Sequence, residues 1–397
     1  MTAETIIRIA AKGDGVTESG RHVTGAVTGD TVGEDGTIAP GPHHIEPPCR
    51  HFGTCGGCQL QQADEDALRQ FVTERVAFAA ESQGIEVGEL LSTHLSPPRT
   101  RRRATLHGLK AGKGAVLGFR EGRSNRIVDM HECHILAPEL FSLVKPLRKL
   151  IAAYAGKGPV DVSLTLADQG VDCSLKGFVA EGLAATEALL DFARDHALAR
   201  LSTDQGYGAE TVWEPEPATT TLGNIPVGLP QNSFLQPTSD GEAVLVGDAR
   251  DFLEGATTIA DLFAGLGTFA FSLADSAKAL AVEAAREAHL ACKSAANSRG
   301  LPVHALHRDL FRNPLTAEET GKFGAIVLDP PRAGAREQVA QIAQGTASRV
   351  AYISCNPSSW ARDAKVLVDA GFKLEKLRPV GQFRWSTHVE LTSYFTR

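Results

Sequence analysis

The thiol of Cys355 is the side chain in this sequence best placed to act as a nucleophile. It follows an apolar run, 351–354, and a helix-like stretch begins just after it. A cysteine between a strand and a helix is where an α/β enzyme displays a nucleophile. Asp329 ends another apolar run, 326–328, in the same way. A thiol and an acid at two strand ends predict a covalent catalyst at one edge of a parallel sheet.

A glycine-rich turn follows a third apolar run and offers a site for a cofactor. It reads D-x-F-x-G-x-G-T over residues 261–268, and its glycines let backbone N–H groups approach a ligand closely. It lacks a third glycine at the dinucleotide spacing, which favours a mononucleoside-type ligand over NAD. Glu283 and Asp309 end the next two expected strands, where one can accept ribose hydroxyls and the other an adenine amino group. Together these groups indicate S-adenosylmethionine, and the alternative for each acid taken singly is a cap of the following helix.

Four of the seven cysteines have the spacing of a metal site. Cys49, Cys55 and Cys58 follow the pattern C-x5-C-x2-C, and Cys133 lies further along the chain. Four thiolates suit either zinc or a 4Fe–4S cluster. Because zinc sites usually come as two C-x2-C pairs, three clustered cysteines and a remote fourth favour the iron–sulfur cluster. Unliganded thiols are the alternative.

The order of the expected strands and helices becomes regular after Gln236. Strands then alternate with helices, which indicates a parallel, doubly wound α/β sheet. Two final strands have no helix between them, and such a terminal β-hairpin is typical of the seven-stranded, Rossmann-like methyltransferase fold. The expected strands are 257–263, 279–283, 303–308, 324–329, 349–354, 373–380 and 389–396, and the expected helices are 266–276, 284–299, 335–345 and 358–370.

The rest of the chain divides into two further regions. Residues 1–45 are rich in Gly, Thr and Val and predict a small β-barrel, with a β-rich arm as the alternative. Residues 46–235 hold the cysteine loop, an expected helix over 63–82 and an α+β region without regular alternation. We therefore expect three domains, the third being a methyltransferase domain over residues 236–397.

Composition and charge indicate where the protein is located and which partners it binds. The chain has 397 residues and a net charge of −7, and no apolar stretch approaches the roughly 20 residues that span a membrane. The N-terminus lacks the basic-then-apolar pattern of a signal peptide, so we expect a cytoplasmic protein without membrane partners. The acidic total does not favour a nucleic-acid partner, but Arg99 and Arg101–Arg103 form a local basic cluster. That cluster is either an RNA contact or a solvated loop.

Taken together, the motifs resemble those of the iron–sulfur uracil-C5 RNA methyltransferases, of the 23S ribosomal RNA type, over nearly the whole chain. The resemblance rests on the four cysteines and on five further motifs. These are Ser233-Phe234-Leu235-Gln236, Asp261-Leu262-Phe263-Ala264-Gly265-Leu266-Gly267, Asp329-Pro330-Pro331-Arg332, Ser354-Cys355-Asn356-Pro357 and His388-Val389-Glu390. It implies a class I, S-adenosylmethionine-dependent enzyme whose N-terminal segment is similar to a TRAM domain, an OB-like RNA-binding barrel.

The resemblance also implies a role for each site residue. Cys355 adds to C6 of the uracil, which makes C5 nucleophilic toward the methyl donor, and Glu390 then removes the C5 proton. Asp329 lies between the cofactor and this base. The residues that hold the cofactor are Gln236, Phe263, Gly265, Gly267, Thr268, Glu283, Asp309 and Asp329, and the cluster ligands are Cys49, Cys55, Cys58 and Cys133.

Two departures from the family pattern leave recognition of the target base open. Thr238 stands where asparagine is common, and the segment 381–388 lacks the acid and the proline that many members have. We expect a monomer that binds an RNA loop or flips the base out. The expected target is a uridine of 23S ribosomal RNA. The alternatives are the T-loop uridine of transfer RNA and a non-catalytic iron–sulfur RNA-binding protein.

Overall fold

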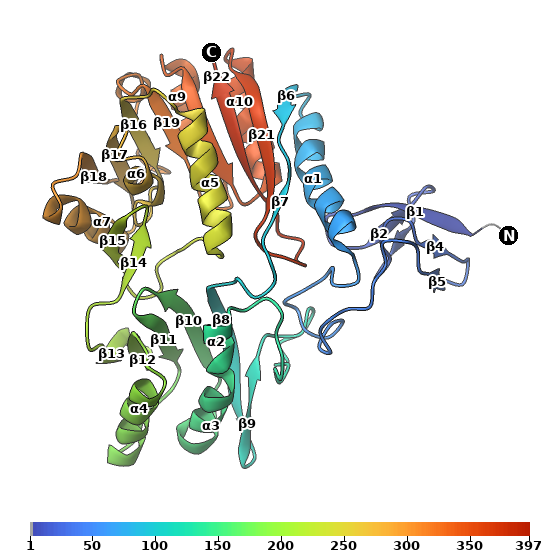
Figure 1. Ribbon diagram of the computed structural model, residues 1–397, viewed down its shortest axis with the longest axis vertical. Coiled ribbons are helices and arrows are strands. Elements are labelled where there is room, and N and C mark those ends of the chain that lie inside the picture. Colours follow the sequence, from blue (N-terminus) through green and yellow to red (C-terminus); the bar gives the residue numbers. More distant parts are fainter. Residues whose placement is uncertain (1–2) are drawn as a thin grey trace.

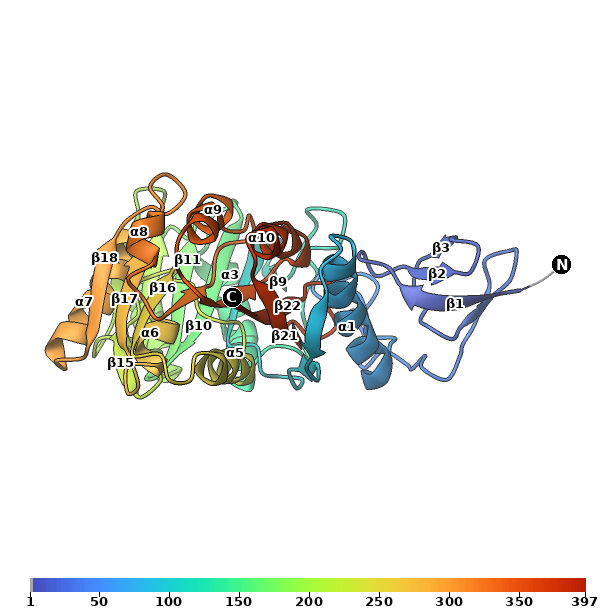
Figure 2. The ribbon, with the colours of Figure 1, turned by 90° about the horizontal axis from the view of Figure 1, so that it is seen from above.

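Three β-sheets make up most of the computed structural model, which describes residues 3–397 (Figure 1). The nine-stranded sheet holds the C-terminal part of the chain, and the six-stranded sheet lies beneath it in this view. The five-stranded N-terminal sheet projects to one side, as the view from above shows (Figure 2). The two larger sheets therefore meet along the edge that carries Cys355.

The nine-stranded sheet has the strand order β18-β17-β16-β19-β20-β22-β21-β6, with β7 also paired to β21. Its strands are β6 (Val87–Leu90), β7 (His94–Leu95), β16 (Thr258–Leu262), β17 (Lys278–Glu283), β18 (Val303–His307), β19 (Ala325–Leu328), β20 (Arg349–Ser354), β21 (Lys373–Gly381) and β22 (Glu390–Thr396). Strands β16 to β20 pair in parallel, and β22 runs antiparallel to β20 and β21. The predicted α/β methyltransferase fold is confirmed.

The sequence does not predict two strands of this sheet. β6 and β7 come from residues 87–95, far upstream of the other strands, and pair in parallel with β21. β6 is an edge strand in which three of four residues are exposed, so it has no apolar alternation for a sequence pattern to detect. The sheet thus has nine strands rather than seven, and it takes in chain that precedes residue 236.

Residues along each parallel strand pack alternately into two cores, one on each face of the sheet. In β20, Val350 and Tyr352 belong to one core, and Ala351 and Ile353 belong to the other. Because helices cover both faces, these strands are apolar throughout. The helices are α1 (Glu65–Glu81), α8 (Ala317–Thr320), α9 (Arg336–Gln344) and α10 (Pro357–Asp369) on the first face and α5 (Ser239–Phe252), α6 (Thr268–Ser272) and α7 (Arg286–Ser298) on the second.

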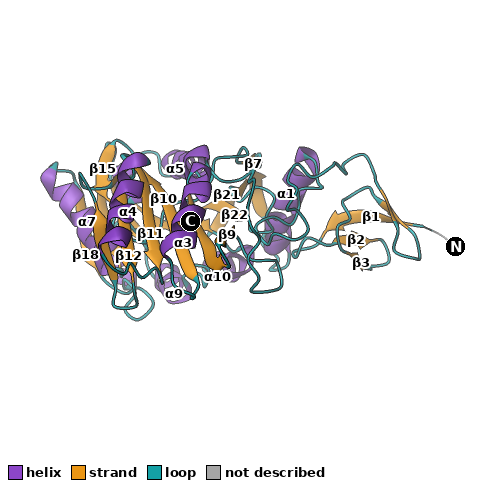
Figure 3. Ribbon diagram, turned by 90° about the horizontal axis from the view of Figure 1, so that it is seen from below, coloured by secondary structure: helices purple, strands orange, loops and turns teal. Residues whose placement is uncertain are grey.

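The six-stranded sheet has the order β13-β12-β11-β10-β8-β9 and is covered on one face by helices. These helices lie on the side away from the nine-stranded sheet, as the view from below shows (Figure 3). In β10, Val162 and Leu164 are buried beneath them, while Ser163 and Thr165 point to the opposite, polar face. The elements are β8 (Arg103–Ala111), β9 (Gly114–Gly118), β10 (Val160–Ala167), β11 (Gly170–Lys176), β12 (Arg200–Asp204), β13 (Ala209–Trp213), α2 (Pro138–Ser142), α3 (Val144–Tyr154) and α4 (Leu183–Asp195).

The N-terminal sheet is small and antiparallel. Its order is β3-β2-β1-β4-β5, around a core of Ile6, Val23, Ala26 and Val32. Its strands are β1 (Glu4–Ile9), β2 (Gly15–Thr17), β3 (His22–Val23), β4 (Thr31–Val32) and β5 (Ile38–Ala39), and a separate hairpin is made by β14 (Thr219–Leu222) and β15 (Ile225–Gly228). Within residues 3–397, no helix has the length and apolar character needed to cross a membrane.

Candidate active site

The carboxyl ends of adjacent strands bring the predicted catalytic and cofactor residues to one edge of the nine-stranded sheet. The residues at the ends of β18, β17, β16, β19 and β20, or within two positions after them, include, in that spatial order, Asp309, Glu283, Phe263, Asp329 and Cys355. Open α/β sheets bind their ligands at this edge. The fold therefore places side chains that are far apart in sequence in one row.

Glu390 reaches the same edge from the opposite direction. It is the first residue of β22, in which Leu391 pairs with Ser354, the residue before Cys355. The residue is buried, with 4% of its surface exposed. Cys355 and Glu390 line the same groove. A thiol and a carboxyl group thus face one cavity from neighbouring strands.

A chain of four hydrogen-bonded side chains joins Asp329 to Glu390. The Gln236 amide donates from Nε2 to Oδ2 of Asp329 over 3.1 Å. The Gln382 amide donates from Nε2 to Oε1 of Gln236 over 2.9 Å, and it also donates to Oε2 of Glu390. Gln236, Gln382 and Glu390 are all buried. Two oriented amides therefore link the two acids.

Burial dominates the protonation of the three reactive groups. It raises the pKa of Glu390 to about 7, and the hydrogen bond from Gln382 opposes this rise. Burial, and then the charge of Glu390, raises the pKa of Asp329 well above its usual range. Burial also raises the pKa of the Cys355 thiol to about 11; the two carboxylates add to this rise and Arg332 opposes it. The resting site therefore holds a neutral thiol beside two acids whose pKa values burial raises.

The glycine-rich turn has the backbone geometry of a ligand site. Phe263, Gly265 and Gly267 have φ values of 63°, 57° and 95°, in the left-handed region. This conformation is uncommon for phenylalanine, and such strain concentrates at functional sites. Beneath the turn, Asp261 is buried and accepts a hydrogen bond from the Ala270 N–H, while its Oδ1 atom has no partner within residues 3–397. A strained aromatic residue and an unpartnered buried oxygen both fit a turn that binds a polar ligand.

Neither Glu283 nor Asp309 caps the helix that follows it. Glu283 accepts hydrogen bonds from the N–H groups of Gly265 over 2.8 Å and Ala285 over 2.6 Å, so it ties the turn to the next strand end. It does not cap α7, whose N-cap is Ala285. Asp309 accepts from the backbone N–H groups two and three residues further on. Thr268 opens α6 directly after the turn. Neither acid is therefore a helix cap, because Thr316 caps α8, the helix that follows Asp309.

An open groove leads from Cys355 and Glu390 to the six-stranded sheet. Its volume is about 870 Å³, at the upper end of the roughly 300–1,000 Å³ of clefts that bind small ligands. Its walls include Ser163 and Thr165 from the polar face of that sheet and residues 56–57 of the cysteine loop. The thiol and the buried acid thus open into a groove that continues onto the polar face of the second sheet.

The basic cluster is divided between this groove and the fold. Arg102 is buried, donates from Nε to the Gln236 carbonyl over 2.9 Å and pairs with Glu242 over 2.6 Å. Arg101 and Arg103 line the groove. The prediction that the cluster contacts RNA is therefore wrong for Arg102, which fixes the backbone beside the active site, and stays a prediction for Arg99, Arg101 and Arg103.

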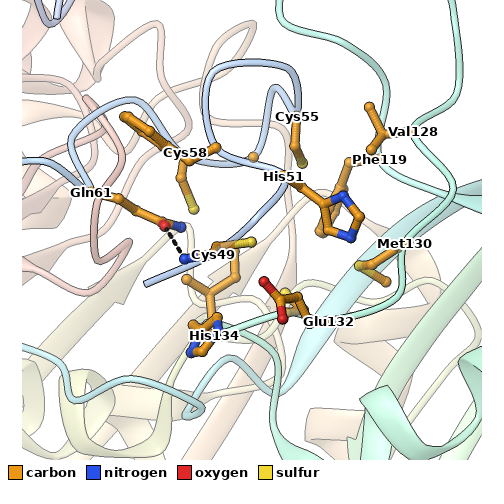
Figure 4. Close-up of a pocket in the computed structure, with 14 residues that line it drawn as sticks. Cys49, His51, Cys55, Cys58, Gln61, Phe119, Val128, Met130, Glu132 and His134 are labelled. Atoms are coloured by element: carbon orange, nitrogen blue, oxygen red, sulfur yellow. Dashed lines mark hydrogen bonds between the residues drawn. The ribbon is translucent and has the colours of Figure 1, made fainter. Parts of the chain in front are cut away.

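The four predicted metal ligands line one cavity, although they come from two distant segments. Figure 4 shows Cys49, Cys55 and Cys58 around this cavity, and Cys133 reaches it from the loop before α2. All four thiols are free of disulfides. Burial raises their pKa values, that of Cys58 to about 12. The fold therefore places four thiols in one cavity, where burial disfavours their ionised form.

Gln382 is the residue of this site that sequence reasoning misses. A lone glutamine has no reactive group and belongs to no motif that predicts chemistry. The register of the terminal hairpin is the signal that locates it, because Val380 of β21 pairs with Glu390. A side chain two residues after Val380 is therefore held close to the buried acid.

Proteins similar to this chain are RNA methyltransferases. Residues 306–397 match the family described as tRNA (Uracil-5-)-methyltransferase. An uncharacterized RNA methyltransferase of Zymomonas mobilis is 48% identical over 393 residues, which cover 99% of each chain. The 23S rRNA (uracil(1939)-C(5))-methyltransferase RlmD of Shewanella piezotolerans is 31% identical over 88% of this chain and 82% of its own.

A solved structure has the same fold over the full length. It is the tRNA (uracil-54, C5)-methyltransferase of Pyrococcus abyssi in complex with S-adenosyl-L-homocysteine, with a TM-score of 0.77, 20% identity and 99% of each chain covered. At this identity the likeness concerns the fold alone. Sequence identity to RNA methyltransferases and the row of acid, thiol and acid at the sheet edge lead to one conclusion: the chain belongs to the RNA uracil-5-methyltransferase family.

Proposed function

We propose that the protein transfers a methyl group from S-adenosylmethionine to C5 of one uridine in 23S ribosomal RNA. The observation that supports this best is the row of Asp329, Cys355 and Glu390 on neighbouring strands at the end of an open groove. Uracil C5 is a weak nucleophile and its hydrogen is not acidic, so its methylation requires a nucleophile and a base. A methyl acceptor that is already nucleophilic, such as an amine, needs no thiol.

Each residue then has one step in the reaction. The Cys355 thiolate adds to C6, and the electron pair of the C5–C6 double bond becomes available at C5. S-adenosylmethionine supplies the methyl group that C5 takes up. Glu390 removes the C5 proton, the electron pair restores the double bond, and the sulfur leaves C6. The carbon–sulfur bond thus forms and breaks within one turnover.

The protonation of the free site is consistent with these roles. A general base works best when its pKa lies near the working pH, and burial raises the pKa of Glu390 to about 7. The pKa of Cys355 near 11 keeps it as a thiol at rest, and Arg332 is the cation that favours its thiolate. The nucleophile is therefore available only as a small thiolate fraction until substrate fills the groove.

The residues at the glycine-rich turn fit S-adenosylmethionine. The turn has left-handed backbone at three positions and an unpartnered oxygen of Asp261 beneath it. Glu283 already holds the turn and retains acceptor capacity for ribose hydroxyls. The side chains and backbone that would hold the cofactor are Gln236, Phe263, Gly265, Gly267, Thr268, Glu283, Asp309 and Asp329.

The cysteine cavity fits a 4Fe–4S cluster better than zinc. Zinc with Zn–S bonds of about 2.3 Å holds tetrahedral sulfurs roughly 3.8 Å apart. In the described part of the chain, no three of the four sulfurs all lie within 4.8 Å of one another. A four-iron cluster is larger than a single ion and holds its thiolates further apart. We infer a cluster with a structural or RNA-docking role, because methyl transfer needs no electron.

The sequence relationship supports ribosomal RNA as the substrate. The relative with 31% identity acts on uracil 1939 of 23S rRNA. The transfer-RNA enzyme shares the fold at 20% identity, which does not bear on the substrate. Mass mapping of methylated uridines in RNA from a deletion strain tests the target directly. Loss of 5-methyluridine from transfer RNA alone would contradict the proposal.

Covalent trapping tests the roles of the two catalytic residues. Cys355→Ala should give no methylation and no protein–RNA adduct, since nothing adds to C6. Glu390→Gln should still add to C6 and take up the methyl group, so an adduct that carries methyl label should accumulate on a denaturing gel. A labelled adduct in Cys355→Ala would reassign the nucleophile, and full turnover by Glu390→Gln would move the base to Asp329.

A further inference from the structure

We propose that Gln382 is a positioning residue that holds Glu390 as an ionised base and connects it to Asp329 through Gln236. The proposal rests on the function proposed above, because it concerns the base of that reaction. Its starting point is geometric: one buried amide contacts both the base and the next amide in the chain.

The Gln382 amide uses both of its hydrogens inside the site. Nε2 donates one to Oε2 of Glu390 and the other to Oε1 of Gln236 over 2.9 Å. Only 2% of Gln382 is exposed, so water does not compete for these bonds. The Gln236 amide must then present its own Nε2 to Asp329, as it does over 3.1 Å. The position of each amide is thus set by its neighbour.

The amide of Gln382 can point in only one direction. Its Oε1 atom is buried and has no hydrogen-bond partner within the described residues. A flipped amide would turn this oxygen toward the carboxyl group of Glu390 and the carbonyl oxygen of Gln236, and both are acceptors. The protein leaves one buried acceptor unpaired in order to keep a donor on Glu390. A side chain with only a packing role would have no reason to do so.

Apart from this donor, the titratable groups around Glu390 include both acidic and basic side chains. Asp329 lies on β19, and the Cys355 thiol lies after β20; each has its pKa raised by the charge of Glu390. Arg332 is the cation that acts on the same thiol, and Arg101 and His388 line the groove beside it. A hydrogen bond to the ionised form is therefore the main local influence that favours a proton-accepting Glu390.

The test is the pH dependence of the step that Glu390 carries out. The full-length protein forms the methylated adduct with large-subunit ribosomal RNA transcribed in vitro, and release of methylated RNA is followed in a single turnover. Gln382→Met keeps the length of the side chain but removes the donor. The rate at which this variant releases methylated RNA should fall about tenfold below neutral pH and recover in alkali. The acidic limb of its pH–rate profile should therefore shift up by about one pH unit.

Two further variants keep the result interpretable. Gln382→Glu is isosteric and adds a carboxylate, so its acid limb should move further in the same direction even if the Met variant folds poorly. Gln338→Met is the matched control, because Gln338 is a buried glutamine of α9 that bonds only the backbone of Leu315. Gln338→Met should lower the stability of the protein without a shift of the acidic limb of its pH–rate profile.

The outcomes separate this proposal from the function on which it rests. A rate loss in Gln382→Met that is equal at every pH, or no loss, would overturn the role of Gln382. Failure of the unmodified protein to form any methylated adduct with either ribosomal or transfer RNA would instead refute the proposed function.

Discussion

The edge of the nine-stranded sheet carries one thiol and the cysteine cavity carries four, and the two regions hold their thiols in different ways. At the sheet edge, Cys355 and Glu390 adjoin paired strands whose register fixes their backbone. At the cavity, the cysteine loop is tied to the next segment by single contacts, such as the Gly56 N–H donating to the Arg120 carbonyl over 2.9 Å. Strand pairing holds the sheet edge, whereas under the proposed function a bound cluster would hold the loop through its sulfurs.

The two sites also differ in the charges around their thiols. Burial raises the pKa of both Cys355 and Cys58, but carboxylates add to this rise at the first and three other thiols at the second. Four adjacent thiolates require a cation to neutralise them. A single thiol beside two acids requires a substrate and a base. Similar burial thus accompanies the proposed metal binding at one site and the proposed covalent chemistry at the other.

The largest expected effect is that loss of methylation and loss of iron occur in different variants. Cys355→Ala should abolish methylation and keep about four irons per chain in anaerobic protein, because the sheet holds its backbone. Cys58→Ser should lose most of the iron and lower the thermal unfolding midpoint, because metal binding contributes folding free energy. Iron content, thermal unfolding and methylation are measured on each variant.

A buried cysteine away from both sites serves as the control for this separation. Cys173→Ala changes a buried residue of β11 and should keep both iron and methylation. Zinc in anaerobic wild-type protein, or unchanged iron in Cys58→Ser, would remove the distinction between the two sites.

Residues fixed by strand pairing can be predicted from the sequence, whereas residues fixed by side-chain contacts cannot. Asp329, Glu283 and Cys355 are predictable because they end apolar runs, and adjacent parallel strands end at one edge. Gln382 is not, because side-chain hydrogen bonds between residues 236, 382 and 390 have no period in sequence. Arg102 is misjudged for a similar reason: a charged residue in a basic run gives no sign that its partner is Glu242, on a distant helix.

The next prediction concerns the arginines between the two regions. Arg102→Ala breaks a buried pair with Glu242 and should cost roughly 3–5 kcal/mol of unfolding free energy. Arg103→Ala loses a hydrogen bond to the Leu235 carbonyl and should cost less, about 1 kcal/mol. It should weaken RNA binding and reduce the slope of log affinity against log salt by about 1. Urea unfolding and binding titrations at several salt concentrations measure the two effects. Equal destabilisation by both variants would show that Arg103 also belongs to the fold.

The smallest expected effect is a gain of stability from loss of the base. Burial raises the pKa of Glu390 from its ordinary value of 4.5 to about 7. Between these values the folded state keeps a proton that the unfolded state has released, so the free energy of unfolding falls as pH rises. Glu390→Gln removes this cost and should be more stable than wild type by on the order of 3 kcal/mol at about pH 8, with no gain near pH 4.

Urea unfolding of both proteins across this pH range measures the difference. Glu319→Gln gives the opposite sign as a control, because hydrogen bonds from Arg308 lower the pKa of Glu319, and this stabilises the folded state above the ordinary carboxyl pKa. A constant gain for Glu390→Gln at every pH would mean that packing, not proton linkage, is responsible. A gain that appears only as the pH rises from about 4 to about 8 would instead show that the sheet edge loses stability by burying its base, as expected where a site is shaped for catalysis.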